Sequence, residues 1–189
     1  NVNVNDLLLG DKNAVILAAR ISGYGEQYNV NVTCPNCQAS IEHEFDLSEI
    51  PHQNGTIPED DNENVYLTPE GTFVAKLPKS QFSVEFKLLT GQDEDYLEKV
   101  ALKTKKLKLP EASATNLLKR LVVSVNDVTV TSEINNFIDN MPAQDARFLR
   151  ACVTTVTPNV DMTQEVECSS CGTVSEMAVP FTSEFFWPN

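Results

Sequence analysis

Two pairs of cysteines, each with two residues between its members, constrain this chain more than any other feature. Cys34 and Cys37 form the first pair, Cys168 and Cys171 form the second, and residues 38–167 separate the pairs. The Cys-x-x-Cys spacing lets two thiolates reach one tetrahedral ion, and two such pairs complete a shell of four sulfur ligands with no position for a reacting water. The sequence therefore predicts one structural Zn²⁺ held by all four cysteines.

The residues that flank each cysteine pair predict β-hairpins. Alternating apolar residues precede both pairs, and Phe45 and Val179 each stand eight residues after the second cysteine of their pair. A period of two is typical of strands, so segments 30–48 and 162–182 are predicted to form the halves of a zinc ribbon. A ribbon has a small apolar core, so we expect metal binding to be coupled to folding.

Other uses of these cysteines fit the sequence less well. The chain has 189 residues and an odd number of cysteines, five, which argues against a disulfide framework. A redox motif needs one pair at a strand-to-helix turn, whereas strand patterns follow both pairs here. Cys152 lies on an apolar helical stripe and is predicted to be a buried small hydrophobe. His43 and His52 stay open as replacements for a thiolate.

The charge of the chain bears on its partners. Asp and Glu outnumber Lys and Arg by 27 to 14, which gives a formal net charge of −13. Such a charge repels phosphate backbones, so we expect no nucleic-acid partner. No apolar run reaches the roughly 18 residues that span a bilayer, so we expect no membrane partner. The length fits a single domain over residues 1–189, and a start at Asn1 without methionine leads us to expect a missing N-terminal segment.

Between the ribbon halves the sequence predicts an α+β fold with a mobile acidic loop at 48–64 and a mostly helical insertion at 81–158. The predicted helices run over 12–21, 90–108, from 113, 132–138 and 142–156, and the predicted strands over 65–67, 72–77, 82–88 and 121–125. The helix at 12–21 is expected to be capped by Asp11, stopped by Gly23 and mostly buried. Arg20 in this helix is either a charge at the helix end or a ligand-binding group.

Three aromatic residues lie near the end of the sequence, where chains usually fray. They are Phe185, Phe186 and Trp187. Exposed aromatic clusters are common at interfaces, so these side chains either pack on the core or anchor a neighbouring protein. No Ser/His/Asp set, glycine-rich phosphate loop or His-x-x-x-His pattern is evident, and the sequence therefore predicts no enzyme.

The chain resembles the T4-type phage baseplate protein family, whose members are hub subunits of contractile tails. The motifs that carry this resemblance are DLLLGDKN (6–13), RISGYG (20–25), VTCPNC (32–37), FDL (45–47) and FKLLTG (86–91). The resemblance implies a non-enzymatic structural role, several copies per baseplate, and other baseplate and tail proteins as partners. It also implies assembly in the cytoplasm of the host bacterium and a final location in the virion. A nucleic-acid-binding zinc-ribbon protein and an assembly chaperone are the alternatives.

Overall fold

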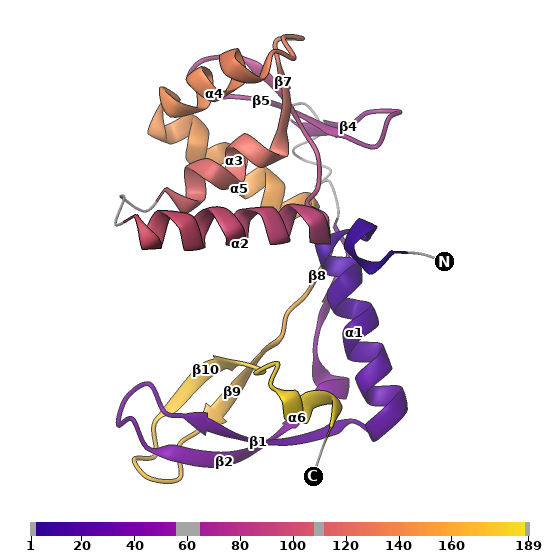
Figure 1. The fold of residues 1–189 in the computed structure, drawn as a ribbon, viewed down its shortest axis with the longest axis vertical. Helices are drawn as coiled ribbons and strands as arrows, with labels where there is room; N and C mark the ends of the chain where they lie inside the picture. Colours follow the sequence, from indigo (N-terminus) through magenta and orange to yellow (C-terminus); the bar gives the residue numbers. More distant parts are fainter. Residues whose placement is uncertain (1–2, 56–64, 108–111, 188–189) are drawn as a thin grey trace. The chain divides into compact units, whose positions relative to one another are not determined.

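The computed structural model describes residues 3–55, 65–107 and 112–187 (Figure 1). The chain divides into two compact units. Unit 1 comprises Asn1–Lys12 and Asn54–Pro158, and unit 2 comprises Asn13–Gln53 and Asn159–Asn189. Each unit has its own cluster of buried apolar side chains. A single domain over residues 1–189 stays a prediction, because it requires that the two units unfold together.

Unit 1 contains a four-stranded antiparallel sheet with strands in the order β4-β5-β6-β7. The strands are β4 (Val65–Leu67), β5 (Phe73–Lys76), β6 (Ser83–Phe86) and β7 (Val122–Val125). Alternate residues face the core, so that Phe73 of β5 lies opposite Phe86 of β6 with their rings stacked 5.7 Å apart. Both rings are buried. Each predicted strand in this unit is present, although three of the four are shorter than predicted.

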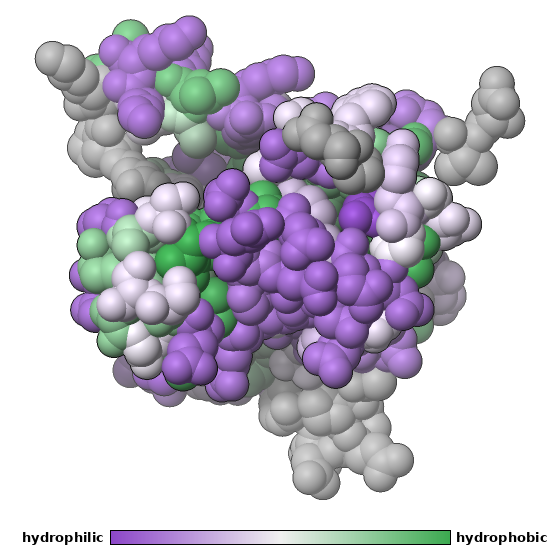
Figure 2. Space-filling model, turned by 90° about the horizontal axis from the view of Figure 1, so that it is seen from below, coloured by the Kyte–Doolittle hydropathy of each residue, from purple (hydrophilic) through white to green (hydrophobic). Residues whose placement is uncertain are grey.

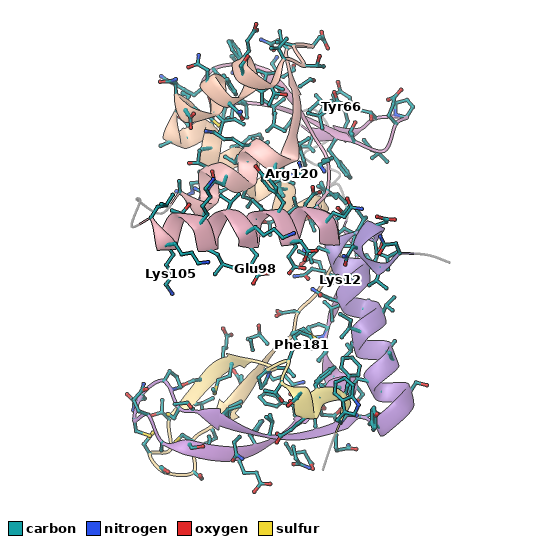
Figure 3. All side chains as sticks on the ribbon, viewed as in Figure 1. Lys12, Tyr66, Glu98, Lys105, Arg120 and Phe181 are labelled. Carbon is teal, nitrogen blue, oxygen red and sulfur yellow. The ribbon has the colours of Figure 1, made fainter. Side chains whose placement is uncertain are left out.

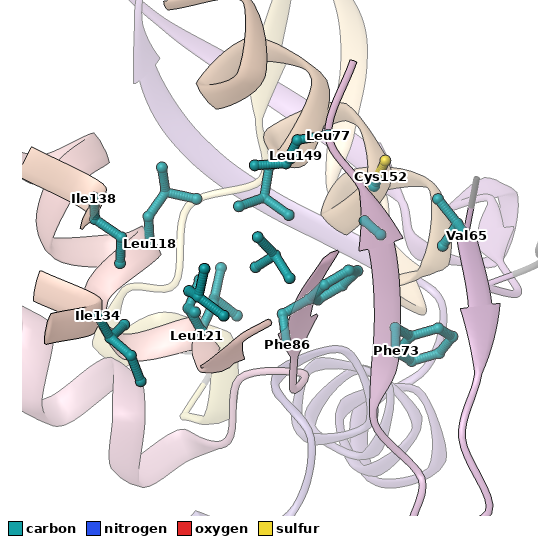
Figure 4. Close-up of a cluster of buried hydrophobic side chains, with 14 of the residues drawn as sticks. Val65, Phe73, Leu77, Phe86, Leu118, Leu121, Ile134, Ile138, Leu149 and Cys152 are labelled. Carbon is teal, nitrogen blue, oxygen red and sulfur yellow. The ribbon is translucent and has the colours of Figure 1, made fainter. Parts of the chain in front are cut away.

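Four helices complete the core of unit 1. They are α2 (Gly91–Lys106), α3 (Ser113–Leu121), α4 (Thr131–Asp139) and α5 (Ala143–Val156), and the single turn η1 (Val4–Asp6) precedes them. Leu118, Ile134 and Leu149 come from three of these helices and meet the sheet in one buried cluster, which Figure 4 shows. Cys152 of α5 belongs to the same cluster and is 7% exposed, so the prediction of a buried Cys152 is confirmed.

Two buried carboxylates fix the connections of unit 1. Asp93 completes a capping box with Thr90 at the start of α2, which confirms Thr90 as the predicted N-cap. Asp145 in the first turn of α5 accepts hydrogen bonds from the backbone N–H groups of Lys79 at 2.7 Å and Ser80 at 2.9 Å. These bonds hold the turn between β5 and β6 against the helix, because a buried carboxylate needs its partners.

Unit 2 is built from two hairpins. The first pairs β1 (Gln27–Thr33) with β2 (Ser40–Asp46), and the second pairs β9 (Thr163–Glu167) with β10 (Val174–Ala178). A short antiparallel pair, β3 (His52–Gln53) with β8 (Asn159–Val160), lies where the chain leaves and re-enters the unit. Tyr28, Val30 and Val32 point from β1 into the core, as the alternating pattern predicts.

Three local predictions in and beside unit 2 were wrong. The first helix, α1, runs over Leu9–Tyr24, so Asp11 lies in its first turn and Gly23 lies inside it. Gly25 ends the helix instead, because it adopts a φ of 85° that favours glycine. Of the residues of α1, Gly10, Leu17 and Arg20 are buried, so the helix is not mostly buried.

The segment after the first hairpin is more ordered than the predicted acidic loop at 48–64. It begins with the single turn η2 (Leu47–Glu49) and continues into β3, so that His52 lies in a strand. Residues 56–64 of that predicted loop lie outside the described residues. No helix in the described part of the chain has both the length and the apolar character that a bilayer-spanning helix needs.

Candidate metal centre

The loop between β1 and β2 forms a compact knuckle around the first cysteine pair. The backbone N–H of Cys34 donates to the Ala39 carbonyl at 2.9 Å, and the N–H of Gln38 donates back to the Cys34 carbonyl at 3.0 Å. Gln38 follows the second cysteine directly and has a φ of 60°. This left-handed residue turns the chain back into β2.

The loop between β9 and β10 repeats this hydrogen-bond pattern at the second pair. The Cys168 N–H donates to the Thr173 carbonyl at 3.0 Å, and the Gly172 N–H donates to the Cys168 carbonyl at 2.8 Å. Gly172 takes the same place as Gln38 and has a φ of 68°. The two knuckles are therefore local copies of one conformation, although their sequences share little beyond the cysteines.

The two knuckles bring the four predicted sulfur atoms together. Sγ of Cys34 lies 3.8 Å from Sγ of Cys171, and Sγ of Cys37 lies 3.7 Å from Sγ of Cys168. All four sulfur atoms lie within 4.8 Å of one another. A tetrahedral ion with metal–sulfur bonds of about 2.3 Å requires sulfur–sulfur edges of about 3.8 Å. A disulfide would need about 2.05 Å, so the spacing fits a shared ion and not a covalent bridge.

Burial of the cysteines follows the same rule in both knuckles. The first cysteine of each pair, Cys34 or Cys168, is buried in the core of unit 2, and the second, Cys37 or Cys171, is exposed. The apolar residue two positions before the pair is buried as well, at Val32 and at Val166. The centre therefore lies with one side against the apolar core and the other side open to water.

Two polar residues beside the sulfur atoms were not predicted. The side-chain amide of Asn36 lies 3.7 Å from Sγ of Cys171 and donates to Oγ1 of Thr173 at 3.1 Å. Oγ1 of Thr173 lies 3.4 Å from the same sulfur. Asn36 thus crosses from the first knuckle to the second. The spacing of the cysteines carries no signal for such a contact, because the two residues are 137 positions apart.

The surroundings of the thiols give them different pKa values. The hydroxyl and backbone N–H of Thr173, followed by the amide of Asn36, lower the pKa of Cys171 to about 6. The backbone N–H of Cys37 lowers the pKa of Cys34. The backbone N–H of Ala39 acts in the same direction on Cys37, but the neighbouring thiols, Cys171 foremost, together with partial desolvation outweigh it and raise the pKa of Cys37 to about 12. Four adjacent thiolates therefore need a cation between them, because like charges oppose ionisation of the last thiol.

The other candidate residues lie elsewhere. The ring of His43 packs edge-on against Phe45 at 4.6 Å, and His52 is paired with Val160 in the short sheet. Neither histidine belongs to the group of side chains that could hold a metal, and neither does Cys152. The set Cys34, Cys37, Cys168 and Cys171 is thus the predicted one, brought together by the fold.

Arg20 is a buried structural residue in unit 2. It is 2% exposed and donates to the backbone carbonyls of Gly25 at 2.8 Å and Gln27 at 3.0 Å. Its guanidinium group lies over the rings of Tyr28 and Phe185 at 5.6 and 5.7 Å. Because α1 continues to Tyr24 and has no basic residue in its last turn, Arg20 is not the predicted charge at the helix end. Its contacts fasten α1 to the start of β1, and a ligand-binding role stays a prediction.

The aromatic residues at the end of the described chain divide between the two predicted roles. Phe185 in α6 (Ser183–Phe186) is fully buried and packs edge-on against Tyr28 at 5.1 Å. Trp187 is 73% exposed. Phe181, which is labelled in Figure 3, is about half exposed. Phe185 therefore belongs to the core, whereas Trp187 and Phe181 leave aromatic surface open to solvent.

The fold and the site together define a mixed helix-and-sheet protein with a cluster of four cysteines. A family model described as "T4 bacteriophage base plate protein" matches residues 1–187, and the chain belongs to this family. The resemblance found in the sequence is thereby confirmed, and membership supports a structural role in a phage baseplate among other tail proteins. No curated protein and no solved structure matches the chain.

Proposed function

We propose that this protein is a structural subunit at or near the hub of a contractile phage baseplate, and that one Zn²⁺ fastens its two hairpins together. The observation that carries the proposal is the set of four sulfur atoms within 4.8 Å, contributed by two knuckles 130 residues apart. Zinc with four thiolate ligands has no open coordination position. The ion therefore stabilises the fold and does not catalyse, which agrees with a structural role and with the absence of an enzyme motif from the sequence.

The proposed zinc ribbon consists of segments 30–48 and 162–182, with the mostly helical insertion at 81–158 between them. The matching knuckle conformations support this ribbon, because each hairpin offers its two sulfur atoms from the same turn. The hairpins also share an apolar core with Leu17 of α1 and Phe185 of α6. This core is larger than a bare ribbon provides, so we expect loss of zinc to loosen unit 2 without unfolding it completely.

Elemental analysis of the purified full chain tests the metal assignment. We expect about one zinc per chain, because four thiolates complete one tetrahedral shell. Replacing one ligand, Cys37→Ser, should lower the zinc content. It should also weaken the strand pairing in both hairpins, which would appear as faster exchange of their backbone amide hydrogens. The matched control is Cys152→Ser, which removes a thiol from the core of unit 1. Full zinc in Cys37→Ser, or loss of zinc in Cys152→Ser, would refute the ligand set.

The charge of unit 2 supports protein partners and argues against nucleic acid. Residues 13–53 and 159–189 contain ten Asp and Glu residues and a single Lys or Arg, which is Arg20. Because Arg20 is buried, the unit offers no lysine or arginine to a phosphate backbone. On the face shown in Figure 2, hydrophilic residues predominate around smaller hydrophobic areas. Anisotropy titrations with labelled DNA in about 0.15 M salt should stay flat, since non-specific binding depends on basic contacts.

An assembly chaperone and a virion subunit differ in where the protein ends up. A subunit stays in the finished particle, whereas a chaperone leaves before assembly is complete. We expect mass spectrometry of purified virions to detect this chain in several copies, together with the other baseplate proteins. Its presence in infected cells but not in virions would favour the chaperone role and contradict the proposed location.

A further inference from the structure

Helix α2 has far less buried surface than a 16-residue helix usually needs. Its buried residues are Gly91 and Asp93, both in the first turn. Farther along, Leu97 is half-buried and Leu102 is 51% exposed. Amphipathic helices in proteins gain most of their stability from packing an apolar face. The apolar residues of the second half of α2 are therefore available for another contact.

These residues line an open groove beside α3, with a volume of about 1080 Å³. Leu97, Ala101 and Leu102 form the wall on the α2 side, and Ala112, Ala114 and Leu117 form the wall at the start of α3. The small alanine side chains on both walls leave room for a backbone to approach. The shape and the apolar lining suit a helix, because helices pack at interaxial distances of about 8–10 Å where the contact residues are small.

The charges of α2 change sign along the helix. Asp93, Glu94, Asp95 and Glu98 lie in its first half, and Lys99, Lys103, Lys105 and Lys106 follow. Glu98 and Lys105 both line the groove and project from the same side of α2 in Figure 3. They stand seven residues apart, about 10 Å along the axis, so they cannot pair with each other. Among the described residues neither has an ion-pair partner.

The two charges are symmetric about one point of the helix. Glu98 lies 3.5 residues before the midpoint between Ala101 and Leu102, and Lys105 lies 3.5 residues after it. A two-fold axis that is perpendicular to α2 and passes beside this point relates α2 to a second, antiparallel α2. It places Glu98 of each copy opposite Lys105 of the other, with Ala101 and Leu102 at the centre.

We propose that α2 is a homodimer interface, in which the groove of each copy accepts the antiparallel α2 of a second copy. The charge pattern selects this occupant, because a helix with an acidic first half and a basic second half is complementary to itself when reversed. An isologous contact of this kind closes after two copies, since the same patch serves on both sides.

Charge reversal in the full-length protein tests the interface. We expect sedimentation velocity to show a concentration-dependent dimer of the unaltered chain at micromolar protein and low salt, weakened as salt is added. Lys105→Glu, and independently Glu98→Lys, should each raise the dissociation constant about tenfold. Each change replaces two symmetric ion pairs by two repulsive contacts, and each exposed pair has a modest effect. The double change Glu98→Lys with Lys105→Glu should restore dimerisation to within about threefold, because the swapped charges are again complementary.

The matched control is Lys106→Glu, which makes the same charge change one residue along α2. Lys106 does not line the groove, so this variant should dimerise like the unaltered chain while bearing the same cost from the helix dipole. Circular dichroism should show equal helix content in all variants. A monomer at every concentration, equal effects of Lys105→Glu and Lys106→Glu, or a double variant that stays dissociated would each overturn the proposal.

Discussion

The buried carboxylate of Asp93 holds the start of α2 against the rest of unit 1, and its replacement by asparagine should weaken that unit measurably. The carboxylate is 1% exposed and forms ion pairs with Lys87, 2.7 Å away, and with Arg120 of α3. It also accepts hydrogen bonds from the backbone N–H and hydroxyl of Thr90. Asp93→Asn keeps the shape of the side chain, removes its charge and turns an acceptor into an amide donor that faces other donors.

The expected loss follows from these contacts. The capping interaction contributes about 1 kcal/mol. Each charge-assisted bond would contribute about 1.5–3 kcal/mol if fully buried, but the side chains of Lys87 and Arg120 are 37% and 39% exposed. Water screens such pairs, so about 1 kcal/mol for each is appropriate. The sum, about 3 kcal/mol, corresponds to a fall in Tm of about 6–12 °C for a protein of this size.

The pH dependence of this effect has a definite sign. Burial alone would raise the pKa of Asp93, but Lys87, the Thr90 N–H and Arg120 together lower it. A carboxyl with a lowered pKa in the folded state stabilises the fold above the ordinary aspartate pKa of about 4, and this contribution disappears as the pH falls through the lowered value. The stability difference between the two proteins should therefore be complete at neutral pH and shrink below about pH 4.

Urea unfolding of the full chain at a series of pH values measures this difference. The control is Asp139→Asn, because Asp139 pairs with Lys119 but is 50% exposed, and its loss should cost under about 0.5 kcal/mol. A loss below about 1 kcal/mol for Asp93→Asn at neutral pH would refute the estimate for the buried network. A loss that stayed constant down to pH 3 would show that the charge of Asp93 contributes nothing.

Two further substitutions test other parts of the structure. Thr173→Val removes the hydroxyl beside Cys171. Because residues that hydrogen-bond to metal ligands affect the affinity, we expect zinc binding to weaken by about 10- to 100-fold in a chelator competition. Unchanged affinity would show that the hydroxyl does not act on the sulfur. Gly55→Ala would place a methyl group 2.0 Å from the Val156 carbonyl oxygen, so we expect a loss of about 2 kcal/mol or more in unit 1. An alanine variant as stable as the original in thermal unfolding would contradict that close approach.

The sequence predicted which four cysteines the fold brings together because the signal for them is local. Two-residue spacing and alternating flanks lie within each hairpin, so the ligand set and strands β1, β2, β9 and β10 could be recognised without knowledge of the fold. The helices of unit 1 were likewise predicted within a few residues, although only α2 begins at a side-chain cap, Thr90. The N-caps of α3, α4 and α5 are Ala112, Val130 and Pro142, which make no side-chain cap hydrogen bond.

What could not be predicted depends on contacts between distant segments. Tyr28 hydrogen-bonds through its hydroxyl to the Pro180 carbonyl at 3.1 Å, across 152 positions of sequence. Contacts between distant segments also bury Phe185 in the core and place the guanidinium of Arg20 against aromatic rings. The periodicity of the sequence does not reveal such contacts. The start of α1 was misplaced for the same reason, since its Leu9 N–H bonds to the Leu89 carbonyl at 2.9 Å.

The order of the two knuckles along the chain affects how the protein is made. A ribosome completes the first knuckle well before the second, and the 130 residues between them take roughly 7–26 s to synthesise at about 5–20 residues per second. During that interval the proposed zinc site has two of its four ligands. A chain released early, anywhere before Cys168, never acquires the other two. Full coordination at the proposed site therefore requires a chain that extends at least through Cys171.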